Sequence, residues 1–159
     1  RMRFLSSETV KTKKHEISET IVSKEQLQER EKAFREALQT GGTNVDQARF
    51  DYAWCLVYQK EHDQIRLGSK ILAELVCVPE FTRDALYFLA LAQFLLNDYP
   101  ASRKTLQKLL QLNPENRQAQ ELKTLVEEQC QTDGAIGIAV VSGLVAGAAV
   151  LGAALMSRK

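Results

Sequence analysis

The chain has 159 residues, with 21 basic and 20 acidic side chains, so its formal net charge at pH 7 is only +1. Such a balance excludes a strong electrostatic attraction for nucleic acid or for a highly acidic substrate. The three cysteines form no CxxC pair, and this favours one reduced domain facing the cytosol over a disulfide-bonded secreted protein.

Residues 1–22 are expected to form a flexible N-terminal arm, because the segment is polar and weakly periodic. Arg1 precedes the first methionine, which leaves the natural start of the chain open. The first residues resemble the start of a mitochondrial presequence, but Glu8, Glu16 and Glu19 argue against one, since such peptides avoid acidic residues.

A helical domain is predicted over residues 23–132. Its first helix starts after Ser23, which forms an S-x-x-Q capping box with Gln26, and ends at Gly41. Five further helices are expected between breakers that contain glycine, proline or Asn-Asp, and no convincing strand occurs. These helices cover residues 44–61, 64–76, 80–96, 100–112 and 114–131, with Pro114 opening the last one.

The second and third of these helices repeat in the fourth and fifth at a shift of about 34 residues, the period of paired tetratricopeptide helices. Large apolar residues align with large ones, and small residues align where the helices must cross closely. Aligned pairs include Tyr52 with Leu86, Gly68 with Ser102, Leu72 with Leu106 and Leu75 with Leu109. The prediction is therefore all-α, a six-helix bundle with two tandem tetratricopeptide-like repeats and one concave side.

The stretch from Ala135 to Met156 is predicted to be a transmembrane tail anchor. Ser142 is its only polar side chain, and as a helix it would be about 33 Å long, enough to cross a bilayer. A buried core helix is the alternative reading. Because the anchor lies at the end of the chain, the body is expected to stay in the cytosol.

Two smaller features of the tail carry predictions. Gly143 and Gly147, with Ala139 on the same face, form a GxxxG pattern that favours self-association into a homo-oligomer within the bilayer. Residues 157–159 form a basic C-terminal tail, in which Arg158 and Lys159 are the expected targeting residues. With a moderately hydrophobic anchor, they favour outer mitochondrial or peroxisomal membranes over the endoplasmic reticulum.

The concave side of the bundle is the predicted partner-binding groove. The inner-helix positions that would line it are Phe50, Ala53, Val57, Asp84, Tyr87, Leu91 and Phe94. Because this groove is mostly apolar, it suits an amphipathic helix or an extended hydrophobic segment. The competing interpretation is that several of these residues simply belong to the core.

No residue constellation supports catalysis, so an enzyme, a cofactor and a bound metal are not expected. His15 and His62 lack metal-ligand spacing to cysteines or acids. The Gly68-Ser69-Lys70 triplet lacks the upstream glycine of a P-loop, and GxSxG does not occur.

Several segments resemble the mitochondrial fission 1 protein family. They are FDYAWCLV at Phe50–Val57, RDALYFLA at Arg83–Ala90, NPENRQAQEL at Asn113–Leu122 and DGAIGIAVVSG at Asp133–Gly143. The resemblance implies an adaptor of the outer mitochondrial and peroxisomal membranes that recruits a dynamin-related GTPase, directly or through adaptor proteins, for organelle fission. It also implies that the N-terminal arm can lie in the groove, although this arm is longer and more charged than the family leads one to expect.

Two other functions compete with fission. A tetratricopeptide docking receptor for chaperones would need a Lys/Asn clamp for acidic tails, but Ala53 and Val57 occupy the positions concerned. A membrane-permeabilising tail-anchored bundle would need a hydrophobic hairpin in the body, and the sequence contains none. The fission adaptor is therefore the preferred hypothesis.

Overall fold

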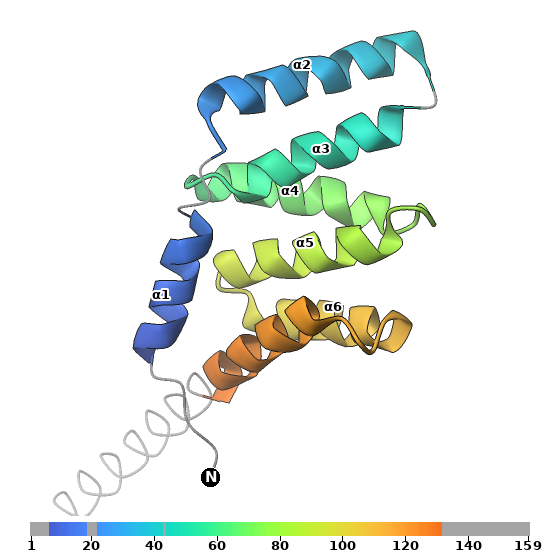
Figure 1. Ribbon diagram of the computed structural model, residues 1–159. Coiled ribbons are helices and arrows are strands. Elements are labelled where there is room, and N and C mark those ends of the chain that lie inside the picture. The colour runs from blue at the N-terminus through green and yellow to red at the C-terminus, as the bar shows by residue number, and fades with distance from the viewer. Residues whose placement is uncertain (1–6, 19–21, 43, 132–159) are drawn as a thin grey trace, which may run out of the picture.

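A computed structural model describes residues 7–18, 22–42 and 44–131, and all regular structure in these ranges is helical. The helices are α1 (Ser7–Ser18), α2 (Lys24–Thr40), α3 (Val45–Val57), α4 (His62–Leu75), α5 (Thr82–Leu95) and α6 (Tyr99–Leu112), followed by a helix over residues 117–131. From α2 onward the helices stack in layers, and α1 stands across their ends beside α3 and α5 (Figure 1).

The body has the six helices predicted for it, but the total of six was wrong, because the arm, expected to be flexible, contains α1. Its sequence has a weak apolar periodicity, yet the acidic Glu8 lies in its first turn and the basic residue His15 in its last, which is the placement that suits the helix dipole. Ion pairing between Lys13 and Glu16, with Nζ and Oε2 3.1 Å apart, adds a small local contribution. The described chain thus has seven helical segments, the six labelled ones and the 117–131 helix.

The structure confirms the predicted start and end of the first body helix, α2. The Ser23 hydroxyl accepts the Gln26 N–H at 3.2 Å, and the Gln26 side chain accepts the Ser23 N–H at 3.0 Å. Gly41 ends α2 in the left-handed conformation at φ 63°. No residue of α2 is buried, so this helix acts as a terminal cap that packs on α3.

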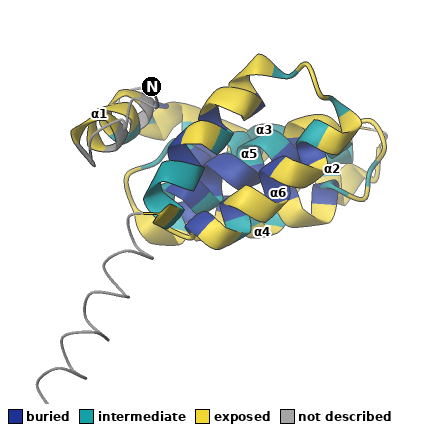
Figure 2. Ribbon diagram, turned by 90° about the horizontal axis from the view of Figure 1, so that it is seen from below, coloured by how far each residue is buried: buried dark blue, intermediate teal, exposed yellow. Residues whose placement is uncertain are grey.

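The two repeats pack as their alignment predicts. Helices α3 and α4 form one pair and α5 and α6 the other, while α3 also contacts α5 along the inner side. At the crossing of the second pair, the fully buried Ser102 donates its hydroxyl to the Ala90 carbonyl at 2.8 Å. At the matching crossing of the first pair, Gly68 lies directly against Ala53 and Leu56. Figure 2 shows the buried residues gathered between these helix pairs, with exposed residues on the outer surfaces.

Replacing Gly68 by alanine is expected to destabilise the fold by about 1–3 kcal/mol through overpacking. A Cβ there would lie 3.0 Å from both the Ala53 carbonyl oxygen and the Leu56 Cβ. Urea unfolding followed by fluorescence of the single tryptophan, Trp54, measures the effect. Gly42→Ala is the control, since no atom lies within 4 Å of its added Cβ. Equal stability of the two variants would contradict close packing at this crossing.

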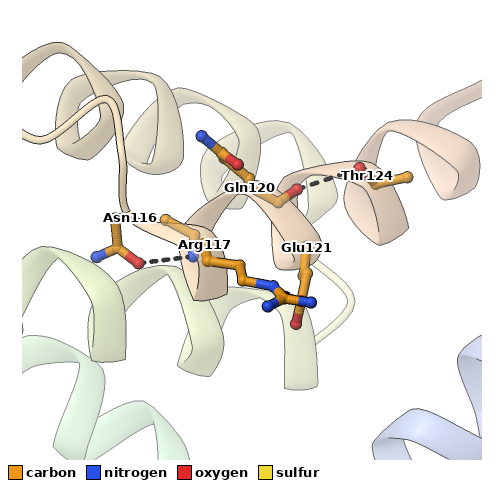
Figure 3. A network of polar contacts seen from close by, with 6 residues as sticks. Asn116, Arg117, Gln120, Glu121 and Thr124 are labelled. Carbon is orange, nitrogen blue, oxygen red and sulfur yellow. Dashed lines mark hydrogen bonds and ion pairs between the residues drawn. The ribbon is translucent and has the colours of Figure 1, made fainter.

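Two helix ends differ from the predictions by three residues or more. Helix α3 stops at Val57 instead of Glu61, because the chain turns at residues 58–61, where the Gln59 N–H bonds to the Leu56 carbonyl at 3.2 Å. The last helix starts at residue 117 and not at Pro114. Asn116 caps it, since its side-chain oxygen accepts the Ala119 N–H at 3.0 Å (Figure 3). The ion pair of Arg117 with Glu121, at 3.1 Å, follows on its exposed side.

Among the described residues, no helix combines the length and the apolar character that crossing a bilayer requires. The predicted anchor at residues 135–156 lies outside the described residues. The same holds for the predicted self-association residues Ala139, Gly143 and Gly147 and for the targeting residues Arg158 and Lys159.

Candidate functional site: the concave face

The predicted groove residues fall on α3 and α5, the inner helices of the two repeats. Four of them are buried, since the exposed fraction is 0% for Ala53, Val57 and Phe94 and 3% for Leu91. Ala53 packs by its carbonyl against Gly68, and Phe94 packs on the ring of Tyr99 with centroids 6.0 Å apart. These two side chains therefore fill the core in this arrangement.

The other three predicted residues, Phe50, Asp84 and Tyr87, keep part of their surface accessible. Two of them belong to a set of five half-buried aromatic residues, which we call the aromatic band: Phe50, Tyr58, Phe81, Tyr87 and Phe88. Ring centroids along the band lie 5.5 Å apart for Phe50 and Phe81, 5.8 Å for Phe50 and Phe88, and 5.3 Å for Tyr87 and Phe88. Such offset and edge-to-face pairs give a rigid apolar surface.

The sequence prediction missed the contribution of the 117–131 helix. A cavity of about 180 Å³ is lined by Tyr58, Tyr87 and Leu91 on one side and by Gln118, Glu121, Leu122 and Leu125 on the other. The repeat period could have revealed this contribution, because a shift of about 34 residues maps Val57 onto Leu91 and Leu91 onto Leu125 of the last helix. The 117–131 helix is therefore a third inner helix of the concave face.

Burial raises the pKa of the Tyr87 hydroxyl above its ordinary value, with smaller contributions from Tyr58 and Glu121. Burial likewise raises the pKa of Tyr58. Both phenols are consequently neutral hydrogen-bond donors at physiological pH. The face offers aromatic surface with neutral hydroxyls and an exposed carboxylate at Asp84, an arrangement suited to binding and not to acid–base catalysis.

Helix α1 lies over one end of this face. Lys13 lines the 180 Å³ cavity together with Tyr87 and Leu91, and Thr9 and Thr12 share a second cavity with Leu125. The part of the face around Phe50 and Asp84 lies toward the opposite ends of α3 and α5. The arm therefore covers only part of the predicted groove.

Lys14 makes the best-defined contact between α1 and the body. Its ammonium lies 4.7 Å from the centroid of the Phe94 ring and 4.9 Å from that of Tyr99, which are cation–π distances. It also donates to the Tyr99 hydroxyl at 3.0 Å and to the Asn97 side-chain oxygen. Asn97 is held for this by the left-handed turn after α5, where its φ is 64°.

The sequence comparisons decide the family. The rat mitochondrial fission 1 protein is 38% identical over 133 residues, covering 82% of this chain and 87% of the rat protein. Its counterpart from Yarrowia lipolytica is 40% identical over 115 residues, covering 71% of this chain and 75% of that one. The chain belongs to the mitochondrial fission 1 protein family. Residues 83–135 also match the profile of the Fis1 C-terminal tetratricopeptide repeat.

Solved structures of the mitochondrial fission 1 family share the fold. The crystal structure of fission protein Fis1 from Saccharomyces cerevisiae superposes with a TM-score of 0.62 at 27% identity, covering 74% of this chain and 90% of that one. Yeast Fis1 in complex with an Mdv1 fragment superposes with a TM-score of 0.59 at 28% identity, covering 71% and 88%. Mitochondrial fission 1 proteins are tetratricopeptide-like adaptors and not enzymes, so the expectation of a non-enzymatic function is confirmed.

Replacing Lys14 by alanine is expected to loosen α1, because it removes the cation–π and hydrogen-bond contacts together. Amide hydrogen exchange in α1 should accelerate by about tenfold, the equivalent of roughly 1.4 kcal/mol. Lys13→Ala is the matched control on the same helix, because the Lys13 side chain borders the cavity of the concave face but its ammonium forms a solvent-exposed ion pair with Glu16 of α1 itself. Equal exchange in the two variants would show that Lys14 does not hold the arm.

Thiol labelling checks the packing beneath the face. Burial raises the pKa of the Cys55 thiol, although Arg30 opposes this, and its side chain is only 1% exposed. Cys77 is exposed. A maleimide should therefore modify Cys77 in the native protein and reach Cys55 only after denaturation, as peptide mass spectrometry would reveal. Rapid native labelling of Cys55 would contradict the packing of α3 against its neighbours.

Proposed function

We propose that this protein is a tail-anchored adaptor of the outer mitochondrial membrane. Its concave face binds a segment of a fission adaptor, which in turn recruits a dynamin-related GTPase. The observation that carries the proposal is the half-buried aromatic band on the concave face, in a family with one member crystallised together with an Mdv1 fragment. The peroxisomal membrane is a second proposed location.

The surface suggests the chemistry of the bound segment. The aromatic band supplies rigid apolar area, and two exposed carboxylates stand near it, Asp84 and Glu121, of which Glu121 is paired with Arg117 on the surface. An amphipathic helix with aromatic or aliphatic anchors and a basic edge complements both features. Leu91 and Leu122, which are nearly buried, would form the floor beneath such anchors.

In this function the N-terminal arm competes with the partner for one end of the concave face. Because Lys13 shares a cavity with Tyr87 and Leu91, a partner that fills this end of the face must displace α1 or bind beside it. Deleting residues 1–20 should therefore raise the affinity for the partner by the free energy that holds α1 in place.

The proposed membrane attachment depends on residues 135–156, with Arg158 and Lys159 directing the chain and the face of Ala139, Gly143 and Gly147 associating with a second copy. Replacing Arg158 and Lys159 by serine should send part of the protein to the endoplasmic reticulum. Unchanged imaging would remove the role given to these two charges.

Complementation tests the proposal as a whole. Cells that lack their own fission 1 protein receive the full chain, a variant without residues 135–156, or a variant carrying Tyr87→Asp. Only the full chain should restore both mitochondrial division and adaptor recruitment. Restoration by the variant without residues 135–156 would overturn the membrane attachment, and restoration by folded Tyr87→Asp would overturn the binding face.

A further inference from the structure

A separate cavity of about 380 Å³ lies where α1 meets the turn between α3 and α4. Its apolar lining comes from the body, where Val57 and Ile65 are almost fully buried and Leu95 is half-buried. The volume falls within the range of small-molecule sites. This cavity adjoins the one on the concave face, because Tyr58 lines both, but Tyr87 and Leu91 do not border it.

The polar lining of the cavity is basic on both walls. Helix α1 contributes Lys11, Lys14 and His15, the turn contributes Lys60 beside the uncharged Tyr58 and Gln59, and α4 contributes its first residue, His62. None of the lining residues is an aspartate or a glutamate. Cationic side chains that face each other across a partly apolar space repel one another until an anion lies between them.

Neighbouring carboxylates are engaged elsewhere. Asp63 pairs with Arg66 at 2.9 Å, and Glu16 pairs with Lys13 at 3.1 Å. Glu61 lines an adjacent cavity, which Lys60 also borders. In the part of the chain that the structure describes, no carboxylate forms an ion pair with Lys11 or Lys60, so both ammonium groups are available to a ligand.

We propose that this cavity binds an amphiphilic anion, a phosphate or carboxylate carried on a short apolar chain. The headgroup lies between Lys11 and Lys60, and the chain lies along Leu95, with the almost fully buried Val57 and Ile65 beneath it. Charge-assisted hydrogen bonds supply the specificity for the anion, and burial of the chain supplies the rest of the affinity.

Binding there also joins α1 to the body, because the two walls of the cavity belong to different parts of the chain. A bound anion therefore holds the arm in its place beside the concave face. This regulatory consequence rests on the proposed function, whereas the binding itself does not.

The test uses the full chain in phosphatidylcholine nanodiscs and follows the methyl signals of Val57, Ile65 and Leu95 by NMR. The probe is hexyl phosphate, compared with hexanol, which has the same chain, and with inorganic phosphate, which has the same headgroup. Hexyl phosphate should shift these signals and bind about tenfold more tightly than either fragment. Equal affinity for hexanol or for inorganic phosphate would overturn the proposal.

Removing the two lysine charges is the second part of the test. The double variant K11Q/K60Q should weaken hexyl phosphate binding about tenfold. The matched control is K104Q/K108Q, which loses two exposed lysines of α6 and should bind as the wild type does. Unchanged binding by K11Q/K60Q would refute the site.

A separate control must show that α1 keeps its position in the lysine variants. The amide signals of Asn97 and Tyr99, next to Lys14, report whether α1 keeps its place in the variants. If α1 moves in K11Q/K60Q, the single variant K60Q decides the matter, because Lys60 belongs to the turn of the body. It should still weaken hexyl phosphate binding severalfold, and unchanged affinity would count against the site.

Comparing lysophosphatidic acid in the nanodisc with soluble hexanoate identifies the source of the anion. Methyl shifts with the first support a membrane-borne ligand, and methyl shifts with the second support a water-borne one. Shifts with neither would contradict the proposed class of ligand.

Discussion

Tyr87→Asp is expected to lower the affinity for the recruited fission adaptor by about thirtyfold or more, while the helices stay folded. Tyr87 is half-buried between the ring of Phe88 and the 117–131 helix, with its surface on the cavity that a partner would fill. A carboxylate there removes the aromatic contact and adds a charge close to Glu121.

Leu67→Asp is the matched control, because Leu67 is a hydrophobic residue of α4 with 43% of its surface exposed outside the concave face. Recruitment of the adaptor to membranes is measured for both variants, together with urea unfolding by Trp54 fluorescence. Recruitment at wild-type level by a folded Tyr87→Asp variant would contradict the role of the aromatic band. Leu91→Asp is the weaker test, because Leu91 is only 3% exposed and a charge there would also disrupt the core.

Phe94→Ala has the second large expected effect, a loss of about 3–5 kcal/mol in the free energy of unfolding. Phe94 is fully buried, packs on Tyr99 and supports Lys14 of the arm. The experiment distinguishes a core role for Phe94 from a role in the groove, since truncating a groove residue would weaken partner binding more than folding. Urea unfolding of the full chain provides the measurement.

Leu112→Ala is the control for the loss of apolar volume, because Leu112 is 56% exposed at the end of α6, and its truncation should change stability by no more than about 0.5 kcal/mol. A Phe94→Ala variant as stable as Leu112→Ala would place Phe94 outside the core and return it to the groove.

The repeated helices were predictable from the sequence because short-range physical signals mark them. The Ser23–Gln26 capping box and Gly41 delimit α2, and the small residues Gly68 and Ser102 mark equivalent crossings. Each signal lies within one helix or recurs at the repeat period. The all-α class and the paired arrangement follow directly from such signals.

Helix α1 was not predictable in the same way. Few apolar positions mark a face in its sequence, and its best-defined contact joins Lys14 to Asn97 and Tyr99, far along the chain. Contacts of this kind depend on the completed fold, and periodicity does not reveal them. The predicted start of the last helix was wrong for a local reason. Asn116 caps this helix through its side chain, so the helix begins after Asn116 and not at Pro114.

The repeat register placed the predicted groove residues on the inner helices, α3 and α5, but did not say how deeply each one is covered. Phe50 and Phe94 both occupy inner-helix positions, yet Phe50 keeps accessible surface whereas Phe94 has none. The difference arises from what packs above each residue, namely Lys14 and Tyr99 in the case of Phe94. Their roles toward a partner stay predictions.

Site-specific photo-crosslinking tests the central claim most directly. A photoreactive phenylalanine analogue replaces Tyr87 in one full-length chain and Leu67 in another, and both are expressed in cells that lack their own fission 1 protein. The account predicts that position 87 captures a fission adaptor that mass spectrometry identifies, while position 67 does not. Capture of that adaptor at position 67, with none at position 87, would contradict binding through the concave face.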